Sequence, residues 1–378
     1  MRALHISDLH LGKRLLEFSL IEDQKYILNQ LLELVEEEKI DVVLLAGDVF
    51  DKSVPSEEAV NLFDDFLTSL AAASIEVCII SGNHDSAERL GFGKKLLRKN
   101  NIYLASVYDG NPCRVIVKDD YGTVNIFLLP FVKPSYVRRY VPEDVREAIV
   151  TYQDAVQYAV KSMQVDVSQR NIIVAHQFVT GAATCDSEEH ILGGLDNVDA
   201  GVFADFDYVA LGHIHSPQNL AGGKIRYCGT LLKYSVSEIS QSKSATIIEL
   251  RSKGNMEIYQ RELKPLRDLR KIKGRYEQLI KMERTCSDDY VYVELTDEEE
   301  QLNAVNTLRR FYPRLLRVAY EKKSRRYEAK DTFFRDVSVT APLELFREFY
   351  TAQHDGAAMS EAEADFVRQL LERAGGDR

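Results

Sequence analysis

The sequence lacks the features of a secreted or membrane protein. No apolar run approaches the length of a membrane span, and the first residues pass directly into a strand pattern that carries Asp8, so we expect no signal peptide. The five cysteines are an odd number and form no Cys-x-x-Cys pair, which argues against a disulfide scaffold or a structural zinc site. Internal repeats and long low-complexity tracts are also missing. These absences favour a cytoplasmic protein with reduced thiols and no membrane partner.

The composition is that of a soluble globular protein. A chain of 378 residues, 45% hydrophobic and 28% charged, is long enough for two or three domains. The net charge of −11 is uneven, because residues 264–330 hold 17 Lys/Arg against 12 Asp/Glu while residues 331–378 hold 5 against 10. Part of the negative charge in residues 1–263 belongs to carboxylates that divalent cations would offset. Net acidity therefore does not exclude DNA as a partner.

Five short polar clusters each follow an apolar, strand-like run directly. They are Asp8-Leu9-His10, Gly47-Asp48, Gly82-Asn83-His84-Asp85, Ala175-His176 and Gly212-His213-Ile214-His215. The runs before them are typical of buried parallel strands, and open α/β sheets bind ligands at the carboxyl ends of their strands. We therefore expect the five clusters to converge on one edge of one sheet.

The converging side chains are carboxylates, an amide and imidazoles, without a thiolate, and this set suits divalent metals. One such histidine alone would be interpreted as a core or surface residue, but the whole set favours a metal site. Asp48, alone after its glycine and central in the motif order, is the natural bridge between two metals. In DLH and HIH the spacing of two predicts that the paired side chains point the same way from an extended backbone.

The motifs DLH, GDVFD, GNHD, AHQ and GHIH resemble, in this order and spacing, the five motifs of calcineurin-like metallophosphoesterases. More narrowly, MRALHISDLHLG, GDVFDKSVPS, ALGHIHSPQ and RYCGTLLKYSVSE are similar to the SbcD family of DNA repair nucleases. The resemblance covers residues 1–250 well and the remainder by size and pattern. It implies an α/β (α+β) protein with a β-sandwich flanked by helices, a small α+β capping domain and a C-terminal helical pair.

The same resemblance implies a set of site residues. It assigns one metal to Asp8, His10, Asp48 and His215, and the other to Asp48, Asn83, His176 and His213. The cofactors would be two divalent cations, with Mn²⁺ favoured. His84 would stabilise charge on the phosphate or protonate the leaving oxygen, a general-acid task suited to imidazole. Asp85 would orient His84 by accepting its other ring N–H.

The periodicity predicts helices interleaved with the strands. We expect them at Leu20–Val35, after Pro55, at Ser86–Lys99 and at Glu143–Met163, with further β-segments at 123–129, 224–228, 245–250 and 256–263. From Lys264 the pattern reads strand, helix, strand, helix, strand through Tyr320, with helices at 274–281 and 298–311. We therefore divide the chain into a nuclease domain (1–263), a capping domain (264–330) and a C-terminal segment (331–378).

By resemblance the capping domain would face DNA, with Arg309, Arg310, Lys322 and Lys323 as the candidate contacts. A packing domain with a solvated basic face is the alternative. In the C-terminal segment, two amphipathic helical patterns flank a Ser360–Glu363 capping-box pattern. The resemblance favours docking on a partner ATPase over packing on its own domain. The candidate docking residues are Leu343, Phe346, Phe349, Tyr350, Val367, Leu370 and Leu371.

Taken together, the leading hypothesis is a two-metal DNA nuclease. It would degrade duplex ends as an exonuclease, cut single strands and hairpins as an endonuclease, and work with an SbcC-like, SMC-type ATPase in DNA repair, recombination and replication, with a possible homodimer within a heterotetramer. A protein phosphatase or other calcineurin-like phosphodiesterase is one alternative. A protein that mainly tethers DNA within an assembly, with a structural metal site, is another.

Overall fold

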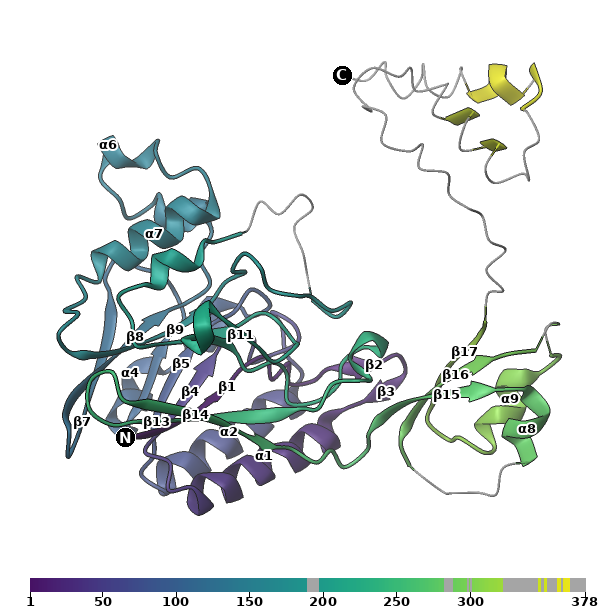
Figure 1. The fold of residues 1–378 in the computed structure, drawn as a ribbon, viewed down its shortest axis with the longest axis horizontal. Helices are drawn as coiled ribbons and strands as arrows, with labels where there is room; N and C mark the ends of the chain where they lie inside the picture. Colours follow the sequence, from purple (N-terminus) through teal and green to yellow (C-terminus); the bar gives the residue numbers. More distant parts are fainter. Residues whose placement is uncertain are drawn as a thin grey trace. The chain divides into compact units, whose positions relative to one another are not determined.

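The computed structural model describes residues 1–188, 197–281, 288–297, 299, 301–321, 346–347, 350–351, 359–361 and 363–367 (Figure 1). Residues 1–321 form one compact unit and residues 322–378 a second. This division into two units does not test the three predicted domain ranges, which stay a proposal. No helix among the described residues is long and apolar enough to cross a membrane.

Two six-stranded sheets form the centre of the first unit. The first has the order β14-β13-β1-β4-β5-β6 and the second the order β11-β12-β10-β9-β8-β7. The bounds in the first are β1 Arg2–Ile6, β4 Val42–Ala46, β5 Glu76–Ile80, β6 Ile102–Ala105, β13 Ser244–Leu250 and β14 Met256–Glu262. In the second they are β7 Cys113–Asp119, β8 Gly122–Leu129, β9 Arg170–His176, β10 Tyr208–Gly212, β11 Gln218–Leu220 and β12 Ile225–Tyr227.

The motif-bearing strands run parallel within each sheet. β1, β4, β5 and β6 pair in parallel in the first, and β8, β9, β10 and β12 in the second, while β13, β14, β7 and β11 are antiparallel additions. The prediction of a single sheet is wrong, because three clusters follow strands of the first sheet and two follow strands of the second. A run of buried apolar residues marks a strand but does not identify its neighbours.

The two sheets pack face to face and create a four-layer molecule. In β4, Val42 and Leu44 point into the apolar layer between the sheets, whereas Val43 and Leu45 point out toward the helices. This alternation follows from the two-residue period of a strand, and burial on both faces explains the nearly continuous apolar runs. The resulting sandwich flanked by helices confirms the predicted calcineurin-like fold.

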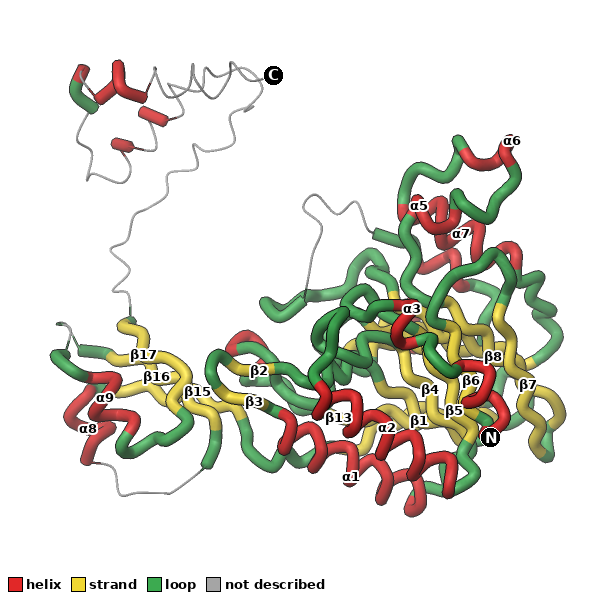
Figure 2. The backbone as a smooth tube through the Cα atoms, turned by 180° about the vertical axis from the view of Figure 1, so that it is seen from behind, coloured by secondary structure: helices red, strands yellow, loops and turns green. Residues whose placement is uncertain are grey.

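Helices cover the outer face of each sheet. α1 (Ile21–Glu37) and α2 (Glu57–Ala72) lie side by side on the first sheet (Figure 2), and α7 (Tyr152–Ser162) packs on the second. Ser56 caps α2 by accepting a hydrogen bond from the Ala59 amide. The other helices of the first unit are α3 Ala87–Leu90, α4 Lys94–Leu97, α5 Pro134–Val137, α6 Glu143–Arg146, α8 Tyr276–Lys281 and α9 Ala304–Arg309.

Two predicted helices are shorter than expected. The segment Ser86–Lys99 is broken between α3 and α4, because Gly93 adopts the left-handed conformation with a φ of 73°. The segment Glu143–Met163 divides into α6 and α7, because Thr151 and Asp154 form a reciprocal capping box that starts a new helix. The apolar period runs through both breaks, so it concealed them.

The capping region has a small sheet and core of its own. β15 (Leu269–Gly274), β16 (Tyr290–Leu295) and β17 (Leu315–Tyr320) are parallel, with α8 and α9 packed on one apolar cluster that includes Val291, Val293 and Leu308. The hairpin of β2 (Arg14–Leu15) and β3 (Phe18–Ser19) belongs to the predicted nuclease domain. It contacts the capping region, because the Phe18 ring packs against the ring of Tyr290 in β16. The predicted order of strands and helices from 266 to 320 is found in the structure.

In the second unit, Ser360 and Glu363 form the predicted capping box. The Glu363 carboxylate accepts hydrogen bonds from the Ser360 amide and hydroxyl, and the Ser360 hydroxyl accepts one from the Glu363 amide. Among the predicted docking residues, Phe346, Tyr350 and Val367 are described and none of the three is fully buried. Leu343, Phe349, Leu370 and Leu371 lie outside the described residues.

Candidate metal centre

The loops that follow the motif-bearing strands turn sharply. Asp8, His10, Asp48 and His213 all have positive φ, with values of 52°, 43°, 49° and 96°. Such conformations are costly for residues other than glycine and are concentrated at functional sites. The expected extended backbone in DLH and HIH is therefore wrong. Hydrogen bonds from the Asp8 amide to the Gly47 carbonyl and from the His10 amide to the Asp48 carbonyl hold the turned loops together.

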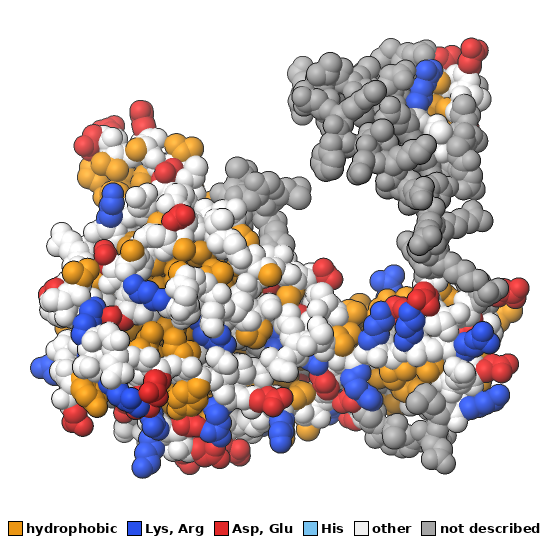
Figure 3. Space-filling model, viewed as in Figure 1, with side chains coloured by type: hydrophobic (Ala, Val, Ile, Leu, Met, Phe, Trp, Pro, Cys, Tyr) orange, Lys and Arg blue, Asp and Glu red, His pale blue; other side chains and the backbone are white. Residues whose placement is uncertain are grey.

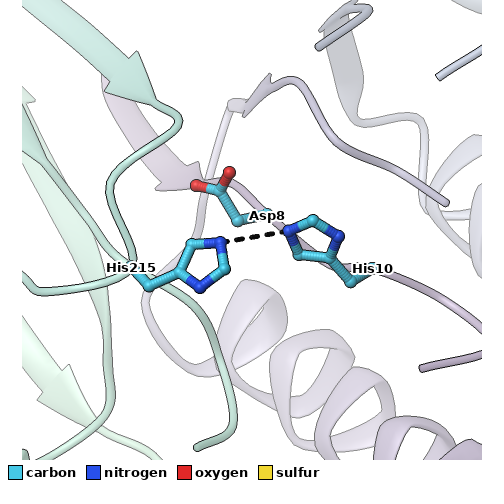
Figure 4. A group of neighbouring side chains, drawn as sticks. All are labelled: Asp8, His10 and His215. Atoms are coloured by element: carbon cyan, nitrogen blue, oxygen red, sulfur yellow. Dashed lines mark hydrogen bonds between the residues drawn. The ribbon is translucent and has the colours of Figure 1, made fainter. Parts of the chain in front are cut away.

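One group of side chains combines ligands from both sheets (Figure 4). Asp8, His10 and His215 are buried and offer ligand atoms that all lie within 4.8 Å of one another. The Nε2 atoms of His10 and His215 are 3.1 Å apart. Asp8 and His10 follow β1 of the first sheet, and His215 follows β10 of the second. The group therefore exists only because the two sheets pack with their strand ends aligned.

Asp48 lies between this group and a second one. Its Oδ2 is 3.7 Å from His10 Nε2 and 3.4 Å from His176 Nε2. Its Oδ1 accepts a hydrogen bond of 2.9 Å from the His84 amide, which fixes the carboxylate in place. A carboxylate with donors on both sides has the position that a bridging ligand needs.

The second group centres on Asn83. Its side-chain Oδ1 is 2.9 Å from both His176 Nε2 and His213 Nδ1. With Asp48 beside His176, these residues bring one carboxylate, one amide oxygen and two imidazoles together. The structure thus brings all seven predicted metal ligands into one cluster. Asp8 also lies with Asp48 and His176 in one group whose ligand atoms are within 4.8 Å of one another, so the division into two metal sets stays a prediction.

The electrostatics of the cluster favour a cation. Burial, with a contribution from the neighbouring Asp48 and against the opposing effect of His176, raises the pKa of Asp8 to about 7. Burial alone would also raise the pKa of Asp48, but His176, His10 and His84 together hold it well below its usual range. Two carboxylates at such close quarters repel each other, and positive charge between them relieves that repulsion.

Two of the histidines are neutral and can donate a lone pair. Burial lowers the pKa of His10 to about 3 and that of His215 well below its usual value. The Nδ1–H of His176 donates to the Ala46 carbonyl at 2.8 Å, which directs Nε2 toward Asp48 and Asn83. Burial lowers the pKa of His176, but the neighbouring Asp48 raises it to about 9, so a metal ion would take the place of that proton. The donor set of imidazoles with carboxylate and amide oxygens therefore fits divalent cations.

A buried network behind His215 was missed in the sequence. The Ser187 hydroxyl lies 2.7 Å from His215 Nδ1 and donates to Glu238, which also forms an ion pair of 2.6 Å with Lys243. The Lys243 ammonium donates in turn to the His215 carbonyl. Glu238 belongs to the stretch RYCGTLLKYSVSE, so the resemblance pointed to it without a role. The network fixes the orientation of the His215 ring from its Nδ1 side, while Nε2 faces His10.

Two glycines make room for these contacts. A Cβ on Gly82 would lie 2.0 Å from Asp48 Oδ1, and one on Gly47 would lie 2.4 Å from His176 Nδ1. Gly47 also has a φ of 86°, which a side chain would disfavour. The glycines of GDVFD and GNHD are therefore needed for close approach of the ligands.

His84 lies at the edge of the cluster and Asp85 does not orient it. The ring Nδ1 of His84 is 3.3 Å from the Asp51 carbonyl, which can only accept, so Nδ1 carries the proton there. The Asp85 carboxylate instead accepts hydrogen bonds from the amides of Val49, Phe50 and Gly82. The predicted role of Asp85 is wrong, because the carboxylate holds together the loops after β4 and β5. A ring nitrogen of His84 also lies close enough to the ligand atoms of His10 and Asp48 for the three residues to bind one metal ion.

The predicted DNA contacts are less concentrated than expected. Arg309 and Arg310 are both exposed, and Arg309 forms an ion pair of 2.7 Å with Glu17. In Figure 3, basic and acidic side chains alternate on the visible face of the capping region, and Lys271 and Lys273 both pair with Glu294. The basic excess belongs to residues 322–330, with five Lys/Arg and one Glu. Lys322 and Lys323 lie in that stretch, outside the described residues.

Comparisons with known proteins identify the family of the chain. The family described as calcineurin-like phosphoesterase matches residues 1–217, and the family described as type 5 capsule protein repressor C-terminal domain matches residues 265–354. The chain is 32% identical over 377 residues to the D subunit of nuclease SbcCD from Staphylococcus epidermidis, covering 98% of each protein.

Solved structures also match at low identity. A dimetal phosphatase from Danio rerio has 15% identity and a TM-score of 0.43, covering 69% of this chain and 96% of its own. The protein TT1561 of Thermus thermophilus has 13% identity and a TM-score of 0.39, covering 68% and 98%. From the family match and the full-length relative, the chain belongs to the calcineurin-like phosphoesterases and, within them, to the SbcD family.

Proposed function

We propose that the chain is a metal-dependent DNA nuclease that hydrolyses phosphodiester bonds at duplex ends and in single strands or hairpins. The observation that carries the proposal is the position of Asp48, between His10 and His176 at the meeting point of two sheets. The two metals would be divalent cations, with Mn²⁺ as the expected ion. They would be held by Asp8, His10, Asp48 and His215 and by Asp48, Asn83, His176 and His213.

When bound, such a metal pair supplies an activated water and compensates charge on the phosphate. The protein's own contribution at the leaving oxygen would come from His84. Because the Asp51 carbonyl holds the Nδ1 proton, Nε2 is the ring atom available to the substrate. A proton on Nε2 could then pass to the departing oxygen.

The activity test compares several substrates with the same purified protein. A labelled blunt duplex, a labelled hairpin, a small chromogenic phosphodiester, a phosphomonoester and a phosphoprotein are incubated with Mn²⁺ and, separately, with chelator. We expect Mn²⁺-dependent hydrolysis of the two DNAs and the phosphodiester. Hydrolysis of a phosphoprotein or phosphomonoester with no cleavage of either DNA would favour the phosphatase alternative instead.

DNA contact by the capping domain is a further part of the proposal. Arg310 is exposed and Arg309 is already paired with Glu17, so Arg310→Glu should weaken DNA binding more than Arg309→Glu does. Reversing Lys322 and Lys323 as well should flatten the salt dependence of binding, because fewer counterions are released. Unchanged affinity and salt slope in the fourfold variant would show that these charges form a solvated face.

The partner is proposed from the name of the Staphylococcus relative, which describes one component of a complex. We propose that an SbcC-like, SMC-type ATPase docks on residues 331–378, through Leu343, Phe346, Phe349, Tyr350, Val367, Leu370 and Leu371. Deleting residues 331–378 should leave a folded, Mn²⁺-active nuclease that no longer co-purifies with the ATPase. Undiminished co-purification would contradict the assignment, and unfolding would support packing in cis.

Self-association is proposed from an exposed apolar segment that follows the GNHD motif in the sequence. Phe92 is 88% exposed and Leu96 is 68% exposed, and both belong to the broken helix after GNHD. Large apolar side chains so exposed often mark protein contacts. Phe92→Glu should shift a homodimer toward monomer in sedimentation experiments.

A cytoplasmic location is likewise proposed, supported by the unpaired state of Cys78, Cys113, Cys185 and Cys228.

A further inference from the structure

A pocket opens beside the metal cluster on the side of Asn83. It has a volume of about 400 Å³, and its wall includes Asn83, Tyr136 and Tyr140. Its size is within the range of ordinary ligand sites. The hydrogen bond from the Phe131 amide to the Ser81 carbonyl joins the end of β8 to the loop after β5 and so places the pocket against the metal site.

Aromatic side chains form part of the lining of this pocket, and one of them contacts a proposed metal ligand. The Phe131 ring is stacked with His213 at a centroid distance of 6.3 Å and an angle of 23°. Tyr108 and Tyr140, which also line the pocket, meet edge to face at 6.1 Å. Tyr136 is 39% exposed and Tyr140 is 48% exposed, so part of their ring surface is accessible.

Basic side chains alternate with these rings. The Lys133 ammonium lies 5.8 Å from the centre of the Phe131 ring, and the Arg139 guanidinium lies 5.8 Å from that of Tyr136. Both cations are exposed, and both line the pocket. Aromatic faces interleaved with cations are the usual means by which proteins bind single-stranded nucleic acid, since bases stack on the rings and phosphates meet the charges.

The pocket lining also contains polar side chains, among them Ser53, Ser86 and Glu88. The Glu88 carboxylate on the same wall can accept hydrogen bonds from an exocyclic amino group. Polar groups of this kind suit the edge of a nucleobase better than an apolar ligand.

We propose that this pocket binds an unpaired nucleobase of the DNA strand, next to the phosphodiester that is cut. The inference rests on the proposed nuclease function and specifies its substrate. A base within a duplex is stacked on both faces and cannot enter, so the pocket selects frayed ends, hairpin loops and single strands. Tyr136 and Tyr140 provide the stacking surface, and Lys133 and Arg139 hold the flanking phosphates.

The test uses variants that leave the metal ligands untouched. Tyr136→Ala removes the accessible ring, Tyr136→Phe keeps it, and Tyr26→Ala on α1 is a matched control at a tyrosine that is 41% exposed. Each protein is assayed with Mn²⁺ on a set of short single strands in which one abasic position moves along the sequence, and on a small chromogenic phosphodiester. Binding is measured separately by the fluorescence of 2-aminopurine in the same strands.

For the wild type we expect one abasic position near the cut to lower kcat/KM by roughly 5- to 150-fold, the range of one lost stacking contact. In Tyr136→Ala the intact strand should lose a similar factor and the abasic position should have no further effect. Tyr136→Phe and Tyr26→Ala should behave like the wild type. Hydrolysis of the small phosphodiester should be equal in all four proteins, and 2-aminopurine quenching should be lost only in Tyr136→Ala.

Three results would overturn the inference in distinguishable ways. If Tyr136→Ala keeps wild-type kcat/KM and quenching on single strands, the pocket binds no base, while the nuclease function stands. If the wild-type protein hydrolyses the small phosphodiester but cleaves no DNA, the proposed function fails and the inference fails with it. A loss of small-phosphodiester turnover in Tyr136→Ala would mean that Tyr136 supports the metal site and not the substrate base.

Discussion

The Nε2 atoms of His10 and His215 lie 3.1 Å apart, although the two residues follow strands of different sheets. Burial keeps both rings neutral. At most one of these two nitrogens carries a proton, because two N–H groups would repel each other at that distance. Asp8 lies within 4.8 Å of both. The contact shows that the site is a property of the interface between the sheets. Changes that alter how the sheets pack should therefore alter metal binding.

His84→Ala should keep both metals and lose most of the cleavage activity. The side chain faces the Asp51 carbonyl, and its backbone amide, which the substitution retains, is what holds Asp48. Loss of a general acid typically lowers the rate by roughly 10²- to 10⁴-fold. Metal content and DNA cleavage should be measured on one preparation. Full activity with full metal would refute the assigned role, and lost metal would make His84 a ligand together with its neighbours His10 and Asp48.

The stability of the protein should depend on His5 in acid. His5 is fully buried between the sheets, with Nδ1 2.9 Å from the Tyr208 hydroxyl. Burial lowers its pKa from 6.5 to about 3, with a further contribution from Arg226. The unfolded chain therefore takes up a proton at a higher pH than the folded chain does. The stability that the neutral ring contributes is fully present above pH 6.5 and is lost as the pH falls toward about 3.

His5→Gln removes this titration and should flatten the pH dependence. Between pH 6.5 and pH 3 we expect the free energy of unfolding of the variant to fall by less than that of the wild type, with a difference on the order of 4 kcal/mol. Urea unfolding at a series of pH values measures this. Parallel curves for the two proteins would show that His5 titrates alike in both states.

Tyr290→Phe should loosen the capping region from the nuclease domain. The Tyr290 hydroxyl donates to Asp23 at 2.9 Å, and Arg267 donates to the same carboxylate oxygen at 3.0 Å. Because Asp23 is only 1% exposed, losing this donor should cost roughly 1.5–3 kcal/mol. Tyr292→Phe, on the same strand, is the control. Limited proteolysis should cut the variant faster after residue 263, and equal protection in all three proteins would contradict the prediction.

Features that depend on a local residue pattern can be predicted from the sequence, whereas features that depend on which strands pair with each other cannot. Asp48 could be identified because Val42–Ala46 is an apolar run that ends at a glycine and a carboxylate. That β4 and β9 belong to different sheets could not, since such a run is compatible with several neighbours. The break at Gly93 was hidden by an apolar period that continues on both sides of it.

The supporting residues of the site were hidden for a different reason. Asp85 binds backbone amides, and amides have no signature in a sequence. Glu238 reaches His215 through Ser187, which is 51 residues away along the chain. Contacts of this kind follow from the folded backbone alone. The predicted metal ligands belong to the family motifs, whereas Ser187 and Glu238, which position His215, lie outside those five motifs.

The most direct test of the two-metal account is the metal content of Asp48→Ala against that of the wild type, measured with DNA cleavage on the same samples. Asp48 lies between both ligand groups, so its loss should weaken both sites. The account predicts two Mn²⁺ per wild-type chain with cleavage of labelled duplex, and, in a variant with an unchanged circular dichroism spectrum, strongly reduced metal and no cleavage. A folded Asp48→Ala protein that retains both metals and cuts DNA at the wild-type rate would contradict it.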